Sequence, residues 1–303
     1  MKHLNFAASY GIALLVGTIV TLSSCSEEVM NPENEPVYAS VNVKVNEFSV
    51  SMEDFPGTRA EQTPAEYEYV GAITLAFYDA NGMEVEKTTQ LRSNFTDLST
   101  FGQFSFTLPV GSYTLVALAY KYDDGDVLTL SSPTSAAYTS TMPRETFCAT
   151  QAVSITSATA LNLSLTLYHI NTWINVRSTD KCPVGAAKVR TTYAAASKGF
   201  NPTTGLATEG TGFSVVSMLN DAVGSTVKVS SCAFLLANEQ TMDITLQVLD
   251  SDDNVLITKV VQNVPLMRNR VTLLKGQLFT PSTASNASFM LETERIDPHT
   301  VDF

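Results

Sequence analysis

Short runs in which apolar and polar residues alternate recur along most of this chain, and this period of two constrains the fold more than any other feature. The clearest run is Leu161, Leu163, Leu165 and Leu167, with polar residues between them. Because successive side chains of a strand point to opposite faces, each run predicts a strand that is buried on one side. Similar runs lie at 41–45, 73–77, 104–108, 113–119, 174–176 and 242–248. No segment shows a long apolar period of 3.6, so the sequence predicts an all-β fold.

The breaks between these runs predict local structure. The apolar positions change parity at Asn46-Glu47, which predicts a β-bulge there. The segment 79–82 (Asp-Ala-Asn-Gly) is typical of a turn. Pro109-Val110-Gly111 separates two alternating runs, and we interpret these as a hairpin. The Ala-rich segment 183–197 is compatible with a short helix.

Many short strands with turn signals between them favour β-sandwiches. At roughly 130 residues each, two sandwich domains account for the length of the chain better than one. The Leu ladder ends near residues 167–170, so we predict an N-terminal sandwich over 38–168 and a C-terminal sandwich over 169–303.

The N-terminus has the pattern of a bacterial lipoprotein signal peptide over residues 1–24. Lys2 precedes an apolar run at 12–22 that is too short for a permanent membrane span, and small residues lead into Cys25. This resembles a lipobox, which implies that Cys25 is acylated, with palmitate-type chains, and starts the mature protein. Ordinary secretory cleavage, leaving Cys25 as a free thiol, is the alternative. Residues 25–37 are polar, acidic and contain two prolines, as expected of a flexible tether.

Composition and motifs exclude several functions. The formal net charge of −12 disfavours nucleic-acid binding. The chain has no HExxH, P-loop or G-x-S-x-G motif, so we predict neither an enzyme nor a cofactor or metal site. The segment 250–254 resembles the start of a calcium loop, but Val255 stands where that loop needs Gly. We therefore predict a hairpin turn there, with a weak surface calcium site left open.

The remaining cysteines give no redox or zinc motif, because no CxxC occurs. Cys232 lies in an apolar run and is predicted to be a buried free thiol. A disulfide between Cys148 and Cys182 is left open. Tyr168 and Trp173 flank the region of His169, and we expect both aromatic side chains to be buried between the two domains rather than to form a ligand platform.

Several segments, taken in order, resemble the fimbrillins of type V pili, including their minor and anchor subunits. They are the lipobox and tether, the segments 56–60 and 108–117, and the segments 199–206 and 265–272. The resemblance implies two transthyretin-like (Greek-key) sandwiches in a lipoprotein of the outer membrane surface. It also implies that the partners are other pilus subunits, joined by β-strand addition.

In that family a surface protease cuts after an arginine beyond the first strand, and a strand of the next subunit fills the groove left behind. The resemblance places such a cut between Arg59 and Ala60, and residues 60–67 are predicted to form an accessible loop. The strand that would leave carries Val41, Val43, Val45, Phe48 and Val50. Segments 272–279 and 288–292 are candidate donor strands. Anchor subunits of the family are not cut, so an ordinary surface role for Arg59 stays open.

These observations predict a structural and adhesive subunit of a type V-like pilus, an anchor or accessory subunit rather than the stalk. The alternative is a glycan-binding surface lipoprotein, which would need exposed aromatic side chains, whereas the chain has one Trp. A ligand on a host or bacterial surface is left open.

Overall fold

The fold is that of a computed structural model, which describes residues 36–49, 61–122, 127–139, 142–281 and 289–295. Apart from two short 3₁₀ turns, η2 (Arg92–Asn94) and η3 (Leu98–Thr100), these residues form strands and loops. The prediction of an all-β chain is therefore confirmed. Within these ranges no helix has the length and apolar character that a bilayer crossing needs.

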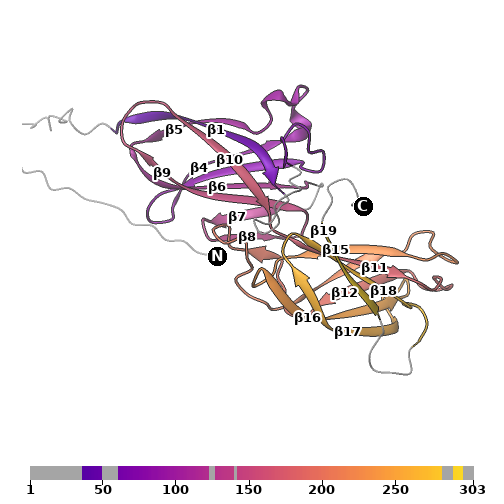
Figure 1. The fold of residues 1–303 in the computed structure, drawn as a ribbon. Coiled ribbons are helices and arrows are strands. Elements are labelled where there is room, and N and C mark those ends of the chain that lie inside the picture. Colours follow the sequence, from indigo (N-terminus) through magenta and orange to yellow (C-terminus); the bar gives the residue numbers. More distant parts are fainter. Residues whose placement is uncertain (1–35, 50–60, 123–126, 140–141, 282–288, 296–303) are drawn as a thin grey trace, which may run out of the picture. The chain divides into compact units, whose positions relative to one another are not determined.

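Eight strands of the N-terminal half form one hydrogen-bonded set (Figure 1). Its order is β2-β1-β10-β9-β6-β3-β4, and β5 pairs with the same edge of β1 as β2, opposite β10. They are β1 (Tyr38–Ser49), β2 (Glu61–Gln62), β3 (Ala72–Tyr78), β4 (Glu84–Leu91), β5 (Gln103–Pro109), β6 (Gly111–Tyr120), β9 (Thr146–Ile155) and β10 (Leu161–His169). β9 and β10 pair only where Tyr168 meets Cys148 and His169 meets Phe147. The set thus divides into β5-β1-β10, with β2 also on β1, and β9-β6-β3-β4, and the apolar faces of both groups share one core.

Three smaller sheets complete the fold. Their orders are β15-β11-β18-β19, β14-β12-β16-β17 and β13-β8-β7. The strands are β7 (Leu128–Ser132), β8 (Ser135–Tyr138), β11 (Thr172–Ser178), β12 (Lys188–Tyr193), β13 (Gly199–Phe200), β14 (Phe213–Met218), β15 (Lys228–Ala233), β16 (Glu239–Leu249), β17 (Val255–Met267), β18 (Arg270–Gly276) and β19 (Phe289–Arg295).

The core consists of separate apolar clusters. One contains side chains from Ala39 to Leu167, and another contains side chains from Ile174 to Phe279. A third joins Ala72, Ala76 and their neighbours to Ile170, Phe200 and Phe234. Residues 36–303 form one compact unit. The predicted boundary between 168 and 169, and the transthyretin-like topology, stay predictions.

Three local predictions are confirmed. The pairing of β1 with β10 shifts register between Val45 and Glu47, where the bulge was predicted. Asp79 closes the predicted turn before β4, because its Oδ1 accepts the backbone N–H groups of Asn81 and Met83, each at 2.8 Å. Asp250 closes the turn at 250–254 in the same way, by accepting the N–H groups of Asp252 and Asn254.

The predicted hairpin around Pro109-Val110-Gly111 is wrong. β5 pairs antiparallel with β1, whereas β6 pairs with β3 and β9. The chain crosses from one group of strands to the other between β5 and β6, so their apolar faces meet across the core. A crossing and a hairpin produce the same alternation in sequence, because both place every second residue in the core.

The suggestion of a helix in 183–197 is also wrong. β12 occupies its centre and pairs with β14 on one side and β16 on the other. Val189, Thr191 and Tyr193 are buried and alternate with half-buried residues. The tertiary packing of this face overrides the helical preference of the flanking alanines.

The cysteines and aromatic residues near the middle of the chain are now placed. Cys148, Cys182 and Cys232 are all buried and free, so the disulfide between Cys148 and Cys182 does not form. Trp173 is buried as predicted, in a small cluster with Cys232 and Val271. Tyr168 is 47% exposed, which contradicts the prediction that it is buried.

Candidate functional site

β1 is the strand predicted to be exchangeable, and its apolar face lies in the N-terminal core. Val41, Val43, Val45 and Phe48 are each no more than 1% exposed. Three of them follow the strict alternation, and the bulge at 46 changes the parity so that Phe48 also points inward. Val50, Arg59, Ala60 and the lipidation candidate Cys25 lie outside the described residues.

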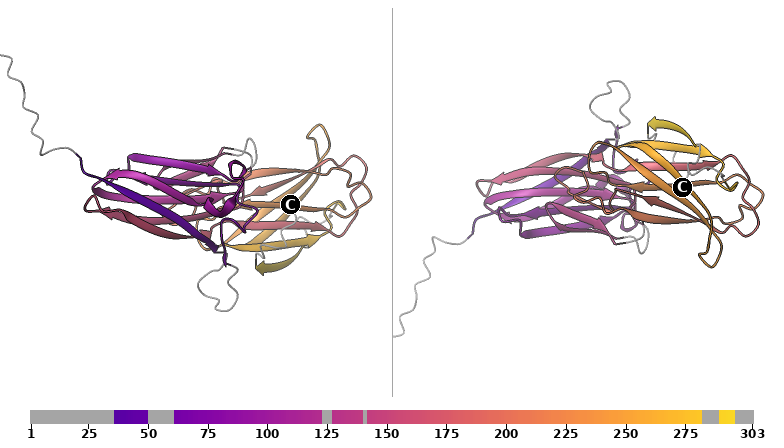
Figure 2. Two further views of the ribbon diagram at one scale, coloured as in Figure 1. Left: turned by 90° about the horizontal axis from the view of Figure 1, so that it is seen from above. Right: turned by 90° about the horizontal axis from the view of Figure 1, so that it is seen from below.

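β1 is paired along both of its edges. It runs parallel to β10 in eight residue pairs and antiparallel to β5 in seven. The indigo strand can be followed along the N-terminal strands in Figure 2. On the outer face, Asn42 Nδ2 donates to Asn162 Oδ1 of β10 at 3.0 Å, and Ser105 Oγ of β5 donates to Asn42 Oδ1 at 2.9 Å. β1 is therefore an interior strand whose removal would expose the edges of two neighbours.

Burial of this face contributes much of the stability of the N-terminal core. Fully burying a Val or Phe side chain is worth about 1.5–3 kcal/mol. For the four large apolar side chains of β1 the sum is on the order of 10 kcal/mol. An empty slot would expose a comparable apolar area on β5, β10 and the strands across the core, so the slot strongly favours being filled.

The chain that follows the undescribed segment 50–60 is fixed to the body of the protein. Gln62 pairs with Phe48 as part of β2. The Arg92 guanidinium donates to the carbonyl oxygens of Pro64, Ala65 and Tyr67 at 2.7, 2.7 and 3.1 Å. Residues 60–67 were predicted to form an accessible loop; this is wrong for Tyr67, which is 2% exposed. Tyr67 is buried because its ring packs into the core.

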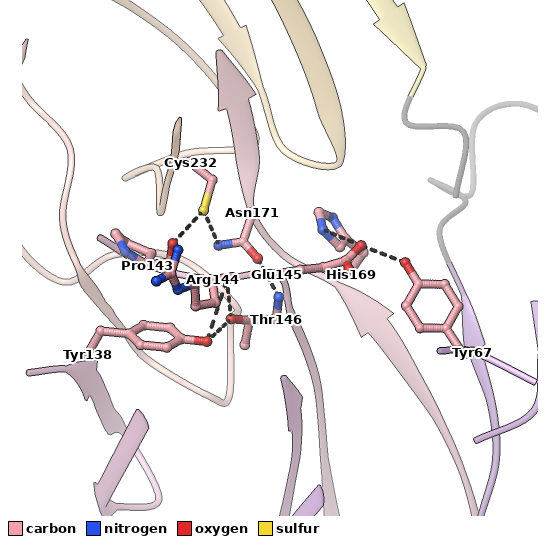
Figure 3. Close-up of polar contacts among 9 residues, drawn as sticks. All are labelled: Tyr67, Tyr138, Pro143, Arg144, Glu145, Thr146, His169, Asn171 and Cys232. Carbon is pink, nitrogen blue, oxygen red and sulfur yellow. Dashed lines mark hydrogen bonds and ion pairs between the residues drawn. The ribbon is translucent and has the colours of Figure 1, made fainter. Parts of the chain in front are cut away.

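Aromatic rings surround the C-terminal end of β1. The ring centroid of Phe48 lies 5.7 Å from that of Tyr67 and 5.0 Å from that of Phe147. Tyr67 also donates its hydroxyl to Glu145 Oε1 at 2.6 Å, as Figure 3 shows. The segment after the loop is thereby connected to the first residues of β9 by a buried hydrogen bond and by ring packing.

Glu145 is a buried carboxyl at this end of the slot. It is 4% exposed, and its burial raises its pKa to about 7, although the Tyr67 hydrogen bond and the charge of Lys121 act in the opposite direction. His169 Nε2 lies 3.8 Å from Glu145 Oε1. Burial, together with the nearby Arg268 cation, lowers the pKa of His169 to about 3. At neutral pH the imidazole is therefore uncharged and Glu145 is close to half ionised.

The polar cluster continues toward the C-terminal strands (Figure 3). Asn171 Oδ1 accepts the backbone N–H of Thr146 at 2.6 Å, and Asn171 Nδ2 lies 3.9 Å from Cys232 Sγ. The Cys232 thiol donates to the carbonyl oxygen of Pro143 at 3.0 Å, and burial raises its pKa. A protonated, enclosed thiol is a poor nucleophile. The cluster connects the start of β9 to β11 and β15.

Sequence reasoning found the buried face of β1 but missed Tyr67, Arg92 and Glu145. No periodic signal marks them, because each acts through specific contacts with residues of other segments. Glu145 stands beside Arg144 in the sequence and has the ordinary pattern of a surface charge there. Among the described residues no group of three His, Cys, Asp or Glu side chains gathers as a metal site.

Comparisons with known proteins place the chain at the level of family and fold. The model of a family of unknown function, DUF6562, matches residues 37–298. No curated protein matches the sequence significantly. Solved structures with a similar fold include the fimbrial anchor protein Mfa2 from Porphyromonas gingivalis, with 10% identity, a TM-score of 0.50, and coverage of 84% of this chain and 95% of that one. They also include a DUF1812 protein from Bacteroides thetaiotaomicron, proposed to bind polysaccharide, with 12% identity, a TM-score of 0.51, and coverage of 86% and 98%. At such identities the likeness concerns the fold alone, which is similar to that of a fimbrial anchor protein and of a DUF1812 protein.

Proposed function

The chain belongs to the DUF6562 family of unknown function, and we propose that it is a structural and adhesive subunit of a type V-like pilus. In this proposal it is an anchor or accessory subunit rather than the stalk, held at the outer membrane surface through acylated Cys25. The observation that carries the proposal is β1, a strand buried on its apolar face and paired on both edges, next to the segment 50–60 in which Arg59 lies.

The fold supports this role. The similar fold of a fimbrial anchor protein shows that such an architecture serves in a pilus. Transfer of that role to this chain is our proposal, because a fold alone does not fix a function.

The geometry of the slot suggests how strand exchange would work. Since Arg92 and Tyr67 hold the chain downstream of the segment 50–60, a cut after Arg59 would free only the N-terminal side, which is β1. The vacated slot would be bordered by β5 and β10. An incoming strand with the direction of β1 would pair with both edges and cover the exposed core, which is the β-augmentation mode of recognition.

The C-terminal region favours an anchor or accessory subunit. β19 pairs antiparallel with β18 of the same chain along seven residue pairs, from Arg270 with Arg295 to Gly276 with Phe289. This segment contains most of the candidate donor at 288–292. A segment that is paired within its own sheet is not free to enter a neighbour, whereas a stalk subunit has to supply such a strand to the next subunit.

We also propose that the chain has no catalytic activity. Two of the fold neighbours are described as a fimbrial anchor protein and as a proposed polysaccharide-binding protein. The buried groups near the slot are the protonated thiol of Cys232, the uncharged imidazole of His169 and the carboxyl of Glu145, which accepts a hydrogen bond from Tyr67. These groups form contacts within the core. Screening the purified protein for hydrolase activity on peptides and glycans is the test, and turnover of either substrate would contradict the proposal.

Mapping the N-terminus of the protein in filaments purified from the cell surface tests the proposed function. An acylated Cys25 in assembled filaments supports an anchor or accessory subunit. A chain that starts at Ala60 instead supports a cleaved accessory subunit in which β1 has been exchanged, and it contradicts the anchor role. A protein that is absent from filaments, or that starts at an unmodified Cys25, would overturn the proposal.

A further inference from the structure

A pocket of about 700 Å³ lies where β9 and β10 diverge, and it adjoins the slot of β1, because Ser164, Leu165 and Thr166 of β10 line the pocket and pair with β1. Its walls come from segments far apart in the chain: β9, β10, the loop at 202–205 after β13, and the turn at 268–269 between β17 and β18. A volume of this size is typical of sites for small ligands, which run from about 300 to 1,000 Å³.

The walls of the pocket are fixed by hydrogen bonds. Cys148 Sγ and Thr150 Oγ1 both donate to the carbonyl oxygen of Pro202, at 3.1 and 3.0 Å. Arg268 donates its backbone N–H to Asn238 O at 2.8 Å and its Nη1 to Thr204 O at 3.1 Å. The loop and the turn are thus attached to the strands, so the pocket is formed before a ligand arrives.

The charge inside the pocket is positive. Arg268 lines it, and among the described residues no carboxylate lies within ion-pairing distance of this guanidinium. The described lining contains no Asp or Glu at all, although the whole chain carries a formal net charge of −12. His169, the other titratable base of the lining, is buried and uncharged at neutral pH. A half-buried arginine without a carboxylate partner is suited to a carboxylate ligand, which it can bind in a bidentate manner.

The remaining lining points to a sugar. It offers the hydroxyl group of Ser164 and the amide groups of Gln151 and Asn238. Four threonine hydroxyls donate within the protein and offer their oxygens as acceptors: Thr150, Thr166, Thr203 and Thr204. Tyr168 lines the same pocket and is 47% exposed, so its ring is available to pack against the C–H face of a sugar. Hydroxyl and amide groups around one cation match a polyhydroxylated acid better than they match the apolar side chains of a peptide.

We propose that this pocket binds an acidic saccharide, with the carboxylate of a uronic or sialic acid unit on Arg268 and a sugar ring against Tyr168. The inference goes beyond the proposed pilus role and does not depend on it, because binding can be measured on the purified protein outside any filament. Failure of binding would leave the N-terminal mapping result untouched, and the reverse also holds.

The test is calorimetric titration of the purified protein with two acidic probes, digalacturonate and 3′-sialyllactose. Their neutral counterparts are the methyl ester of digalacturonate and lactose. We expect at least one acidic probe to bind at least about tenfold more tightly than its neutral counterpart, since loss of a charged partner leaves the guanidinium unpaired. Equal binding of both members of each pair, or no binding of either acidic probe at millimolar concentration, would overturn the proposal.

Variants locate the binding in the pocket. Arg268→Gln is expected to lower the affinity for the acidic probe by about tenfold or more. Arg177→Gln, which removes the same charge from an exposed position on β11, is expected to leave the affinity within about twofold. Tyr168→Ala is a second variant, and because it replaces an exposed side chain it should not disturb the fold. It should weaken binding of the acidic probe while leaving the melting temperature unchanged. Full affinity in both pocket variants would contradict the assignment.

Two peptides test whether the carboxylate that the pocket binds belongs to a saccharide or to the C-terminus of a peptide. A hexapeptide with a free C-terminal carboxylate and the same peptide with a C-terminal amide are titrated in parallel. The proposal expects neither to compete with the acidic saccharide. Displacement of the saccharide by the free acid peptide alone, or binding of the peptide in place of any saccharide, would show that the pocket recognises a chain terminus and would overturn the saccharide assignment.

Discussion

At the scale of single residues, Phe48 has the largest side chain on the buried face of β1, and its ring meets those of Tyr67 and Phe147. Phe48→Ala should lower the free energy of unfolding by about 3–5 kcal/mol, because it leaves a cavity among these rings. Tyr38→Ala is the matched control, since Tyr38 belongs to the same strand and is 51% exposed. Chemical denaturation measures both; equal effects would show that the face of β1 is not the buried one.

Glu145 makes the stability of the protein depend on pH. Its pKa is about 7 in the folded protein and 4.5 ordinarily, so between these values the unfolded chain loses its proton first. The wild-type protein should therefore lose stability relative to Glu145→Gln as the pH rises from about 4.5 to 7. The full difference is about 3 kcal/mol. The Gln side chain keeps an acceptor for the Tyr67 hydroxyl, so the variant removes the charge and little else.

Unfolding of both proteins by denaturant at pH 5 and pH 8 measures this effect. His169 contributes in the opposite direction, because its lowered pKa of about 3 means that stability is lost as the pH falls below its ordinary 6.5. That contribution is present in both proteins and cancels in the difference. The difference in unfolding free energy between wild type and variant should grow as the pH rises. A difference that does not change with pH, or that grows as the pH falls, would contradict a buried Glu145 with a raised pKa.

At this scale the sequence predicts what periodicity can encode. Val41, Val43 and Val45 alternate, and their burial follows from that pattern. The bulge that keeps Phe48 inside is also visible as a change of parity. Tyr67, Glu145 and Arg268 carry no such pattern, because their partners lie far away in the chain: 78 residues separate Tyr67 from Glu145, and 64 separate Arg268 from Thr204. Whether a lone charge is buried is decided only by the tertiary fold.

At the scale of elements, β1 depends on two neighbours, and a covalent link can test this. Asn42 of β1 and Ser105 of β5 are register partners whose side chains are hydrogen-bonded at 2.9 Å. In the double variant Asn42→Cys/Ser105→Cys, a disulfide would close a loop between residues 63 positions apart. Loop closure of this length is worth about 4 kcal/mol of stability.

The same protein in its reduced state is the control for the disulfide. The unfolding midpoint should rise on oxidation and return on reduction, and the single variant Asn42→Cys should show neither change. If the two thiols do not join under oxidising conditions, β1 and β5 are not neighbours in the register described. If they join without a gain in stability, β1 contributes less to the fold than its burial indicates.

The element scale also shows where sequence reasoning fails. The alternation of β5 and β6 was found, yet their pairing was not, since a turn at Pro109-Val110-Gly111 can either close a hairpin or carry the chain across the core. β12 was hidden by its alanine-rich surroundings, although Val189, Thr191 and Tyr193 alternate. Strand existence is a local property, whereas strand pairing is decided by contacts between distant segments.

At the scale of the whole molecule, the slot of β1 and the pocket proposed to bind an acidic saccharide are neighbouring features of one all-β chain, and β10 contributes to both. Nothing in the sequence marks the pocket, because β9, β10, the loop at 202–205 and the turn at 268–269 meet only in the fold. The role of a surface subunit, by contrast, was expected from the order of several weakly specific segments. The structure adds to that expectation an interior strand, β1, that is paired on both edges, and a downstream chain that is held in place by Arg92 and Tyr67.

Exchange of β1 tests the central claim, that this strand is a replaceable ribbon. The protein is cut with an arginine-specific protease, with Arg59→Gln as the uncut control, and a fluorescent peptide with the sequence of residues 37–50 is added in excess. The account predicts that the cut protein takes up the peptide and releases β1, that the control does not, and that the disulfide between positions 42 and 105 blocks uptake until it is reduced. Uptake at equal rates in cut and uncut protein, or no uptake after a verified cut at Arg59, would contradict it.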